Sequence, residues 1–446
     1  MNAPHGGTRR KGQILVMTTL LIIPMLGLLG LVTDVGYMHF VKMSAQTAAE
    51  AAARAAILQM HATVGGSSLT CGGAVVCADT PTACAANITT PSNAMENGCM
   101  YAQQHGFNST GNQLVTYQTG VSSTPPTAPG TGTPSYWATF RVTQKVPQLF
   151  SAIMGNPYGF VAARSTAALT GATDCIYALN PSASGAVSVG GTASLTSSCG
   201  LYVDSNDPCA LSTNGGGSIS ATEYDVVGNA CTHSPLSPTP NTGVSPASDP
   251  LSGLPVPATP RYHCDYKNYS APNWSNPTLT PGTYCGGINI KNNNYTLTAG
   301  TYILVGGGLT TQDANSNISG SGVMFYNTFG ATDQGNQSYS PISIAATSTV
   351  SLTAPNTGTY AGILFFEDRS APAASDTYGG GSTAVYQGVI YAKNAAVTMY
   401  GNSSVNTAYT LLVANTISMV GTTTFNDNYS SLPNGSSPIQ KVSLLE

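Results

Sequence analysis

The feature that most constrains the fold of this chain is a long apolar run close to its N-terminus. Ile14 to Val32 covers nineteen residues without a charged side chain. At 1.5 Å per residue, a helix of that length reaches across a hydrocarbon core of about 30 Å. A cleaved secretory signal has a shorter apolar core, of roughly 7–15 residues. The run therefore predicts an uncleaved membrane anchor and a lipid bilayer as the first partner.

The placement of charge around this run predicts its orientation. Arg9, Arg10 and Lys11 come just before it, and the rest of the chain carries 11 basic and 18 acidic residues. Short basic segments stay on the cytoplasmic side of a membrane, so we expect residues 1–12 in the cytoplasm and the bulk of the chain outside. Its acidic balance argues against nucleic acid as a partner, because phosphate binding requires basic patches.

The apolar run continues into an alanine-rich segment without a clear break. Alanine is the best helix former, and residues 43–56 are mostly alanine. We predict one helix over residues 13–60, whose first half lies in lipid. Pro24 would kink this helix, which membrane helices tolerate.

The ten cysteines all lie beyond the membrane segment. An even number in an exported region indicates disulfides, and we expect pairing within each of two groups. The first group is Cys71, Cys77, Cys84 and Cys99, and the second is Cys175, Cys199, Cys209, Cys231, Cys264 and Cys285. No Cys-x-x-Cys occurs and the six histidines form no ligand-spaced cluster, so we expect neither a metal nor a cofactor.

Residues 61–172 have the pattern of a small α+β module. The expected elements are a helix near residues 94–105, strands at 136–143 and 160–169, and a short helix at 148–154 that begins after Pro147. The order of a long helix, strands, a short helix and a strand is pilin-like.

From about residue 173 the sequence repeats short apolar strands near every twenty residues. Ile288 and Leu309 are twenty-one residues apart, and Val397 and Ile417 are twenty apart. Apolar residues alternate with Ser, Thr or Asn, so stacked strands would bury one face. We predict a right-handed parallel β-helix or a related β-solenoid over residues 173–430, with an antiparallel sandwich as the alternative.

These patterns together divide the chain into five parts. They are a basic segment at 1–12, the transmembrane and alanine-rich helix at 13–60, the α+β module at 61–172, the β-helix at 173–430 and a tail at 431–446. Eight prolines between Thr232 and Arg261 predict that residues 232–261 are an insertion that runs outside the stacked strands.

Two acidic stretches are candidates for other chemistry. Polysaccharide-cleaving enzymes use paired carboxylates, and Glu367 and Asp368 follow an apolar strand. Neighbours on a strand point to opposite faces, so we favour a turn in which Arg369 pairs with one of them. Residues 204–207 offer oxygen ligands for calcium but lack the Gly and Glu of a calcium loop. We therefore predict no catalytic residue.

The N-terminal pattern resembles a known family. Arg-Arg-x-Gly precedes the apolar run, which leads into Gly-Leu-Val-Thr-Asp-Val-Gly-Tyr and then Gln-x-Ala-Ala-Glu-Ala-Ala-Ala. This order resembles the N-terminal segment of TadE/TadG-like proteins of the bacterial tight-adherence (Tad, or Flp) pilus assembly machinery. The anchor motif that carries the resemblance is Gly12, Gly30, Asp34, Gly36, Gln46 and Glu50. The simpler alternative for Asp34 is that it only caps or ends the membrane helix.

The resemblance implies a non-catalytic structural component of pilus assembly. Such a protein crosses the bacterial inner membrane once and contacts other Tad or envelope proteins. Peptidase-cleaved relatives carry Glu at the fifth position after a Gly, whereas Met17 stands fifth after Gly12 here, which favours the uncleaved, TadG-like branch. The alternatives are a surface adhesin or carbohydrate-binding protein with glycans as partners, and a β-helix polysaccharide-degrading enzyme. For the adhesin, Tyr339, Tyr378, Tyr386 and Tyr400 either stack on sugars or form an internal aromatic ladder.

Overall fold

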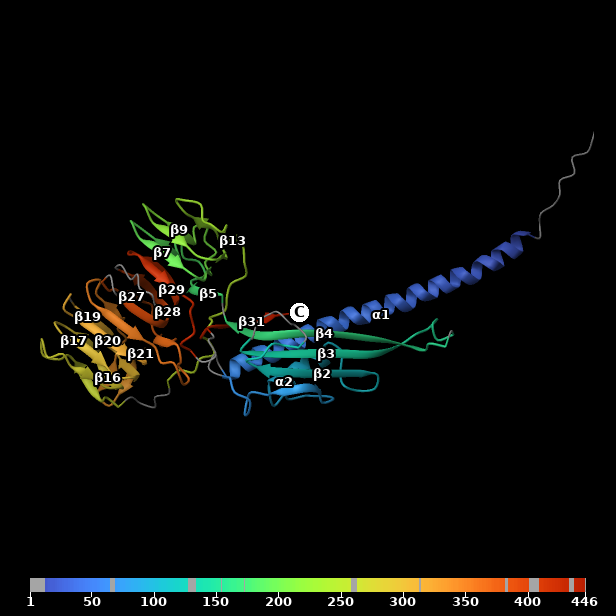
Figure 1. The fold of residues 1–446 in the computed structure, drawn as a ribbon, viewed down its shortest axis with the longest axis horizontal. Coiled ribbons are helices and arrows are strands. Elements are labelled where there is room, and N and C mark those ends of the chain that lie inside the picture. Colours follow the sequence, from blue (N-terminus) through green and yellow to red (C-terminus); the bar gives the residue numbers. More distant parts are fainter. Residues whose placement is uncertain are drawn as a thin grey trace, which may run out of the picture. The chain divides into compact units, whose positions relative to one another are not determined.

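The chain forms two compact units (Figure 1). The computed structural model describes residues 13–64, 69–126, 134–153, 155–171, 173–257, 263–312, 314–381, 384–400, 409–432 and 437–445. The first unit comprises Met1–Thr63, Thr70–Leu169 and Val442–Glu446, and the second comprises Val64–Leu69 and Thr170–Lys441. The second unit is thus an insertion in the chain of the first. The expected basic segment 1–12, and Gly12 with it, lies outside the described residues.

A single long helix, α1 (Gln13–Val64), dominates the first unit and confirms the predicted helix. It contains Pro24 and ends four residues later than expected. Within the described residues, α1 is the helix that is long and apolar enough to cross a membrane. Its C-terminal half buries a face of small residues, among them Ala45, Ala49 and Ala52, in the core of the unit. Alanines at this spacing let a helix lie close to its neighbours.

The other elements of the first unit are a mainly antiparallel sheet and a short helix. Their bounds are β1 (Ala78–Ala83), α2 (Ala94–Gln104), β2 (Gln113–Val121), β3 (Tyr136–Pro147), β4 (Tyr158–Gly171) and β31 (Gln440–Leu444), with strand order β1-β2-β3-β4-β31. Gly98 of α2 has no room for a side chain, because a Cβ there would lie 2.4 Å from the Phe140 ring and 2.7 Å from the carbonyl oxygen of Ala52. The two helices and the sheet therefore share one tightly packed core.

The predicted helix at 148–154 is wrong for the residues that the structure describes. β3 continues to Pro147, which pairs with Tyr158 at the start of β4. Between them the chain makes hydrogen-bonded turns, in which the amide of Ile153 donates to the carbonyl of Phe150. We call residues 148–153 the docking turn, for a reason given below.

The second unit consists of strands, most of which are short. Their bounds are β5 (Asp174–Ala178), β6 (Val187–Val189), β7 (Ser194–Ser197), β8 (Gly200–Val203), β9 (Leu211–Thr213), β10 (Ser218–Ser220), β11 (Tyr224–Val226), β12 (Ala230–Cys231), β13 (Asn241–Thr242), β14 (Tyr266–Tyr269), β15 (Thr278–Leu279), β16 (Gly282–Ile290), β17 (Asn294–Leu297), β18 (Gly300–Val305), β19 (Leu309–Thr311), β20 (Asn317–Ser321), β21 (Val323–Thr328), β22 (Gly330–Thr332), β23 (Gly335–Gln337), β24 (Ser343–Ile344), β25 (Val350–Thr353), β26 (Ile363–Glu367), β27 (Ala374–Tyr378), β28 (Val385–Met399), β29 (Thr410–Met419) and β30 (Thr423–Phe425).

Parallel pairing relates most of these strands. Among the described residues, the named strands of the second unit pair in parallel, apart from the β22–β23 hairpin. Ile288 lies opposite Leu309, and Val397 lies opposite Ile417, so both sequence spacings near twenty residues correspond to neighbouring strands. The antiparallel sandwich considered from the sequence is therefore wrong. In strands such as β6, β17 and β25, alternating side chains point into one continuous apolar core.

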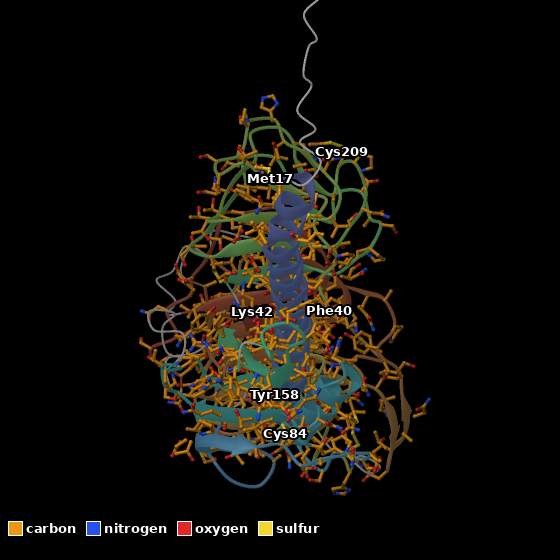
Figure 2. All side chains as sticks on the ribbon, turned by 90° about the vertical axis from the view of Figure 1, so that its right-hand side faces the viewer. Met17, Phe40, Lys42, Cys84, Tyr158 and Cys209 are labelled. Atoms are coloured by element: carbon orange, nitrogen blue, oxygen red, sulfur yellow. A yellow bond between two sulfur atoms is a disulfide. The ribbon has the colours of Figure 1, made fainter. Side chains whose placement is uncertain are left out.

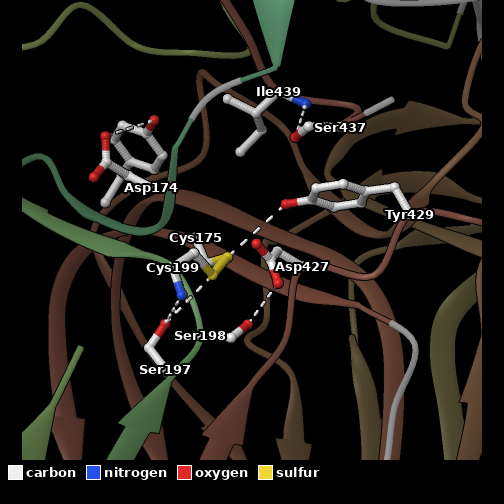
Figure 3. Close-up of a disulfide and its surroundings, with 10 residues drawn as sticks. Asp174, Cys175, Ser197, Ser198, Cys199, Asp427, Tyr429, Ser437 and Ile439 are labelled. Carbon is white, nitrogen blue, oxygen red and sulfur yellow. Dashed lines mark hydrogen bonds between the residues drawn. A yellow bond between two sulfur atoms is a disulfide. The ribbon is translucent and has the colours of Figure 1, made fainter. Parts of the chain in front are cut away.

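The chain order along the longest ladder is not monotonic. β5, the first strand of the unit, lies in the middle, paired with β8 on one side and with β29, near the end of the unit, on the other. From β5 the ladder runs through β8 and β11 to β13, whereas β14 begins at the opposite end and leads back to β29. Close to β5, where the first and last parts of the unit meet, the Tyr429 hydroxyl lies 3.9 Å from the Cys175 sulfur and Ser198 donates to Asp427 (Figure 3).

The proline-rich insertion carries the chain between the two ends of this ladder. Its described part is anchored on β28 and on the turn after β26: Arg369 donates to the carbonyls of Leu251 and Leu254, and the Tyr391 hydroxyl donates to Asp249 at 2.7 Å. Both leucines are buried. Within this stretch β13 pairs in parallel with β11, so the stretch does not run wholly outside the stacked strands as predicted.

Five disulfides join all ten cysteines, and each stays within one of the two groups. The pairs are Cys71–Cys77, Cys84–Cys99, Cys175–Cys199, Cys209–Cys231 and Cys264–Cys285. The last three have sequence separations of 24, 22 and 21 residues. These separations match the spacing of neighbouring strands, so each of the three links consecutive turns of the parallel stack.

Candidate functional site

The Asp34 carboxylate in the middle of α1 binds the backbone of the docking turn. It accepts hydrogen bonds from the amides of Leu149 at 2.9 Å, Phe150 at 3.0 Å and Ser151 at 2.8 Å. The side chain is only 5% exposed. Hydrogen bonds to an ionised acceptor are roughly twice as strong as neutral ones. Asp34 therefore fixes the position of the β3–β4 connection on the helix.

Gly30, one helical turn before Asp34, provides the second half of this contact. The Phe150 ring lies so close that a Cβ on Gly30 would be 2.3 Å from the ring carbon Cγ. On the other side of the turn, Gly159 packs against Met38, and a Cβ there would be 2.6 Å from its sulfur. The contact is thus steric as well as polar. Gly159 was not predicted, since nothing in its local sequence points to α1.

The remaining described residues of the anchor motif act within α1. Gln46 donates to Glu50 at 2.8 Å, a pairing across one helical turn. Gly36 is exposed and would have no neighbour within 4 Å of a Cβ. The alternative in which Asp34 only caps or ends the membrane helix is wrong, because α1 continues to Val64.

The N-terminal half of α1 exposes large apolar side chains, which Figure 2 shows along the helix from Met17 to Phe40. A soluble helix rarely exposes an apolar surface on all sides, whereas a membrane-spanning helix does so. Gly30 and Asp34, where the docking turn meets the helix, are the first buried positions among the described side chains of α1, although Val35, Tyr37 and Phe40 beyond them stay exposed. The docking contact is therefore the N-terminal end of the packed face of α1.

The carboxylates considered for catalysis have internal roles. Glu367 ends β26 and is buried, and it shares a hydrogen bond with Asp376 of β27. Asp368 accepts from Thr328 at 2.7 Å and from Tyr326 at 2.9 Å. Burial alone would raise the pKa of Asp368, but hydrogen bonds from Ser370, Thr328 and Tyr326 lower it below its usual value. Glu367 is thus buried, whereas Asp368 is partly exposed and binds hydroxyl groups of its own unit.

The expected pairing of Arg369 with one of these carboxylates is wrong. Its guanidinium is taken up by the proline-rich insertion and by the Tyr391 hydroxyl, to which Nε donates at 3.0 Å. The hydrogen bond from Arg369 to the Leu254 carbonyl joins residues more than a hundred positions apart in the sequence. A local pattern therefore gave no signal for it.

The stretch at 204–207 is an irregular segment between β8 and the turn at 208–209, and its carboxylates bind backbone amides. Asp204 accepts from Ala247 and Asp207 accepts from Cys209, both at 2.7 Å. In the part of the chain that the structure describes, no group of three His, Cys, Asp or Glu side chains could hold a metal ion.

Two of the tyrosines considered as sugar platforms belong to the core. Tyr378 and Tyr386 are buried, with ring centroids 5.9 Å apart in an edge-on arrangement, and Phe365 packs against Tyr378 at 5.2 Å. This is the aromatic ladder considered as the alternative. Tyr400 is partly exposed and Tyr339 is half-buried.

Comparison with known proteins gives one match. No curated protein and no solved structure matches the chain. A family model does match residues 12–65, the segment that holds the whole anchor motif and all of α1. The match ends before the sheet of the first unit, so it covers the helix side of the docking contact and not the turn that Asp34 binds. Residues 12–65 are accordingly a Tad domain of the Flp pilus-assembly TadE/G-like family.

Proposed function

We propose that this protein is an uncleaved, TadG-like structural component of Flp (Tad) pilus assembly. In this proposal, α1 holds the chain in the bacterial inner membrane with its N-terminus in the cytoplasm. The remainder is exported and contacts other pilus or envelope proteins. The family of residues 12–65 and the apolar length of α1 support the proposal, and the five disulfides agree with an oxidising compartment outside the cytoplasm.

The observation that carries a structural role is the docking of the β3–β4 connection on Asp34. A helix of 52 residues is about 78 Å long, which is more than twice the thickness of a hydrocarbon core. The half that does not fit in the bilayer is the core helix of the first unit. Asp34 and Gly30 then clamp that unit to the helix at the membrane end. The sheet of the first unit is thereby tied to the membrane anchor, as a tether requires.

We also propose that the second unit is a right-handed parallel β-helix. Its parallel ladders, strand spacings near twenty residues and continuous apolar core support this assignment. We retain the division into an anchor at 13–60, a pilin-like module at 61–172 and a β-helix at 173–430. The β-helix would serve as a contact surface rather than as an enzyme. The buried carboxylates around Glu367 support that non-catalytic role.

The experiment that tests the proposal separates docking from membrane insertion. We expect Asp34→Ala to reduce the number of Flp pili on the native bacterium, because the first unit loses its clamp, while the protein still fractionates with membranes. Gly36→Ala is the matched control. It changes an exposed position two residues away, where an added Cβ would have no neighbour within 4 Å. Normal piliation in the Asp34 variant, at normal protein level, would contradict the proposal.

A further inference from the structure

We propose that the tip of the β3–β4 hairpin is a second membrane contact, inserted into the outer interface of the same bilayer that α1 crosses. The inserted residues are Leu149 and Ile153 of the docking turn and Phe160 near the start of β4. This inference rests on the proposed membrane anchoring by α1. It adds a lipid-binding surface in a part of the chain that lies outside the Tad domain.

Three large apolar side chains at this tip are left almost fully exposed. Leu149 is 77% exposed, Ile153 is 83% exposed and Phe160 is 77% exposed. They lie within twelve residues of one another at one end of a strand pair. Exposed apolar groups gathered in this way mark a surface that meets a protein or a membrane.

The docking contact sets the depth of the tip relative to the bilayer. Phe150, between the exposed residues of the turn, packs on Gly30. Gly30 lies inside the charge-free run 14–32, about 6 Å before Asp34 along the helix. At this level α1 also exposes Leu31 and Val32. A bilayer that surrounds this turn of the helix therefore also reaches the hairpin tip. Lipid is accordingly the partner that covers the exposed apolar side chains of the tip.

The residues behind the tip have the character of a membrane rim. The Lys145 ammonium lies 3.9 Å from the centroid of the Tyr158 ring, and tyrosine and lysine are typical of the membrane–water interface. Four residues further along β3, Arg141 lies opposite Arg164 of β4. These three basic residues belong to a chain with only 14, and they lie where anionic headgroups would attract them. The apolar tip would lie among the acyl chains and the basic residues behind it would lie among the headgroups, which is the order of a bilayer surface.

Tryptophan fluorescence in lipid vesicles tests this contact directly. The full chain is reconstituted in vesicles of phosphatidylcholine and phosphatidylglycerol, with Trp274→Phe to remove the exposed native tryptophan, while Trp137 stays buried. Ile153→Trp then places the probe at the tip. Thr124→Trp is the matched control, because it is exposed near the other end of β3, about 36 Å along the strand. Leu28→Trp reports on the anchor itself.

We expect lipids brominated near the headgroup end of the acyl chain to quench the probe at residue 153 several-fold more than the probe at residue 124. Quenching at residue 28 with none at residue 153 would overturn the hairpin contact and leave the anchor intact. Absence of quenching at both residues 28 and 153 would overturn the membrane anchor, and this inference with it.

Discussion

A carboxylate in the middle of a helix usually faces water, but Asp34 satisfies three backbone amides of a distant turn. Its partners lie 115 to 117 residues further along the chain. The sequence marks Asp34, because a charge directly after an apolar run is conspicuous, but it carries no information about what the charge binds. The same holds for Gly30, whose lack of a side chain makes sense only once Phe150 is seen above it.

Gly30 and Gly36, both in the anchor motif, give opposite predictions for the same substitution. Gly30→Ala should destabilise the first unit, because the new methyl group overlaps the Phe150 ring and forces it away, a type of overpacking that costs about 1–3 kcal/mol. Gly36→Ala meets open space and should stabilise the helix by up to about 1 kcal/mol, since alanine replaces glycine in a helix interior. Thermal unfolding in detergent measures both. Equal melting temperatures for the two variants would contradict the docking geometry.

At the scale of elements, the prediction succeeds where the signal is local and fails where a distant partner decides. The long helix and β3 follow from composition and alternation within a few residues, and the stacking of β16 on β19 follows from a spacing of twenty-one residues. The predicted helix at 148–154 fails, because hydrogen bonds to Asp34 and closure of the β3–β4 hairpin outweigh local propensity. The central place of β5 was not predictable either, since similar repeats do not specify which turns become neighbours.

The buried carboxyl groups of Glu367 in β26 and Asp376 in β27 predict that the stability of the fold depends on pH. Burial, followed by the hydrogen bond and repulsion from Glu367, raises the pKa of Asp376 to about 10, against about 3.9 in an unfolded chain. The folded state thus binds more protons than the unfolded state between these values. Its stability is greatest below about pH 4 for this group and falls as pH rises towards 10. Asp376→Asn should therefore flatten the fall in melting temperature between pH 6 and pH 9.

Asp368 is the matched control for that measurement. Hydrogen bonds hold its pKa below the usual value, so its contribution is present at neutral pH and disappears only as pH falls through the acidic range. Asp368→Asn should lower the melting temperature throughout pH 6–9 without changing the slope. A slope in the Asp376 variant equal to that of the native chain would show that this carboxyl does not carry a proton in the folded state.

At the scale of the molecule, the chain combines an anchor that matches a known family with a larger part that matches no solved structure. The second unit is inserted between β4 and β31 of the first, so both ends of the insertion are held by the sheet that packs on α1. Within it, disulfides link consecutive turns at three places. A stapled, apolar-cored stack of this kind suits a durable exported structure, in line with the proposed role as a tether and contact surface.

The measurement that tests the central claim most directly is the N-terminus and intact mass of the native protein, determined separately in washed inner membranes and in sheared surface filaments. The account predicts that α1 remains joined to the basic segment before Gly12, and that this uncleaved protein is confined to the membrane fraction. A species that begins at Gln13 in the filament fraction would contradict it, because the protein would then be a processed pilus subunit rather than a membrane-held component of assembly.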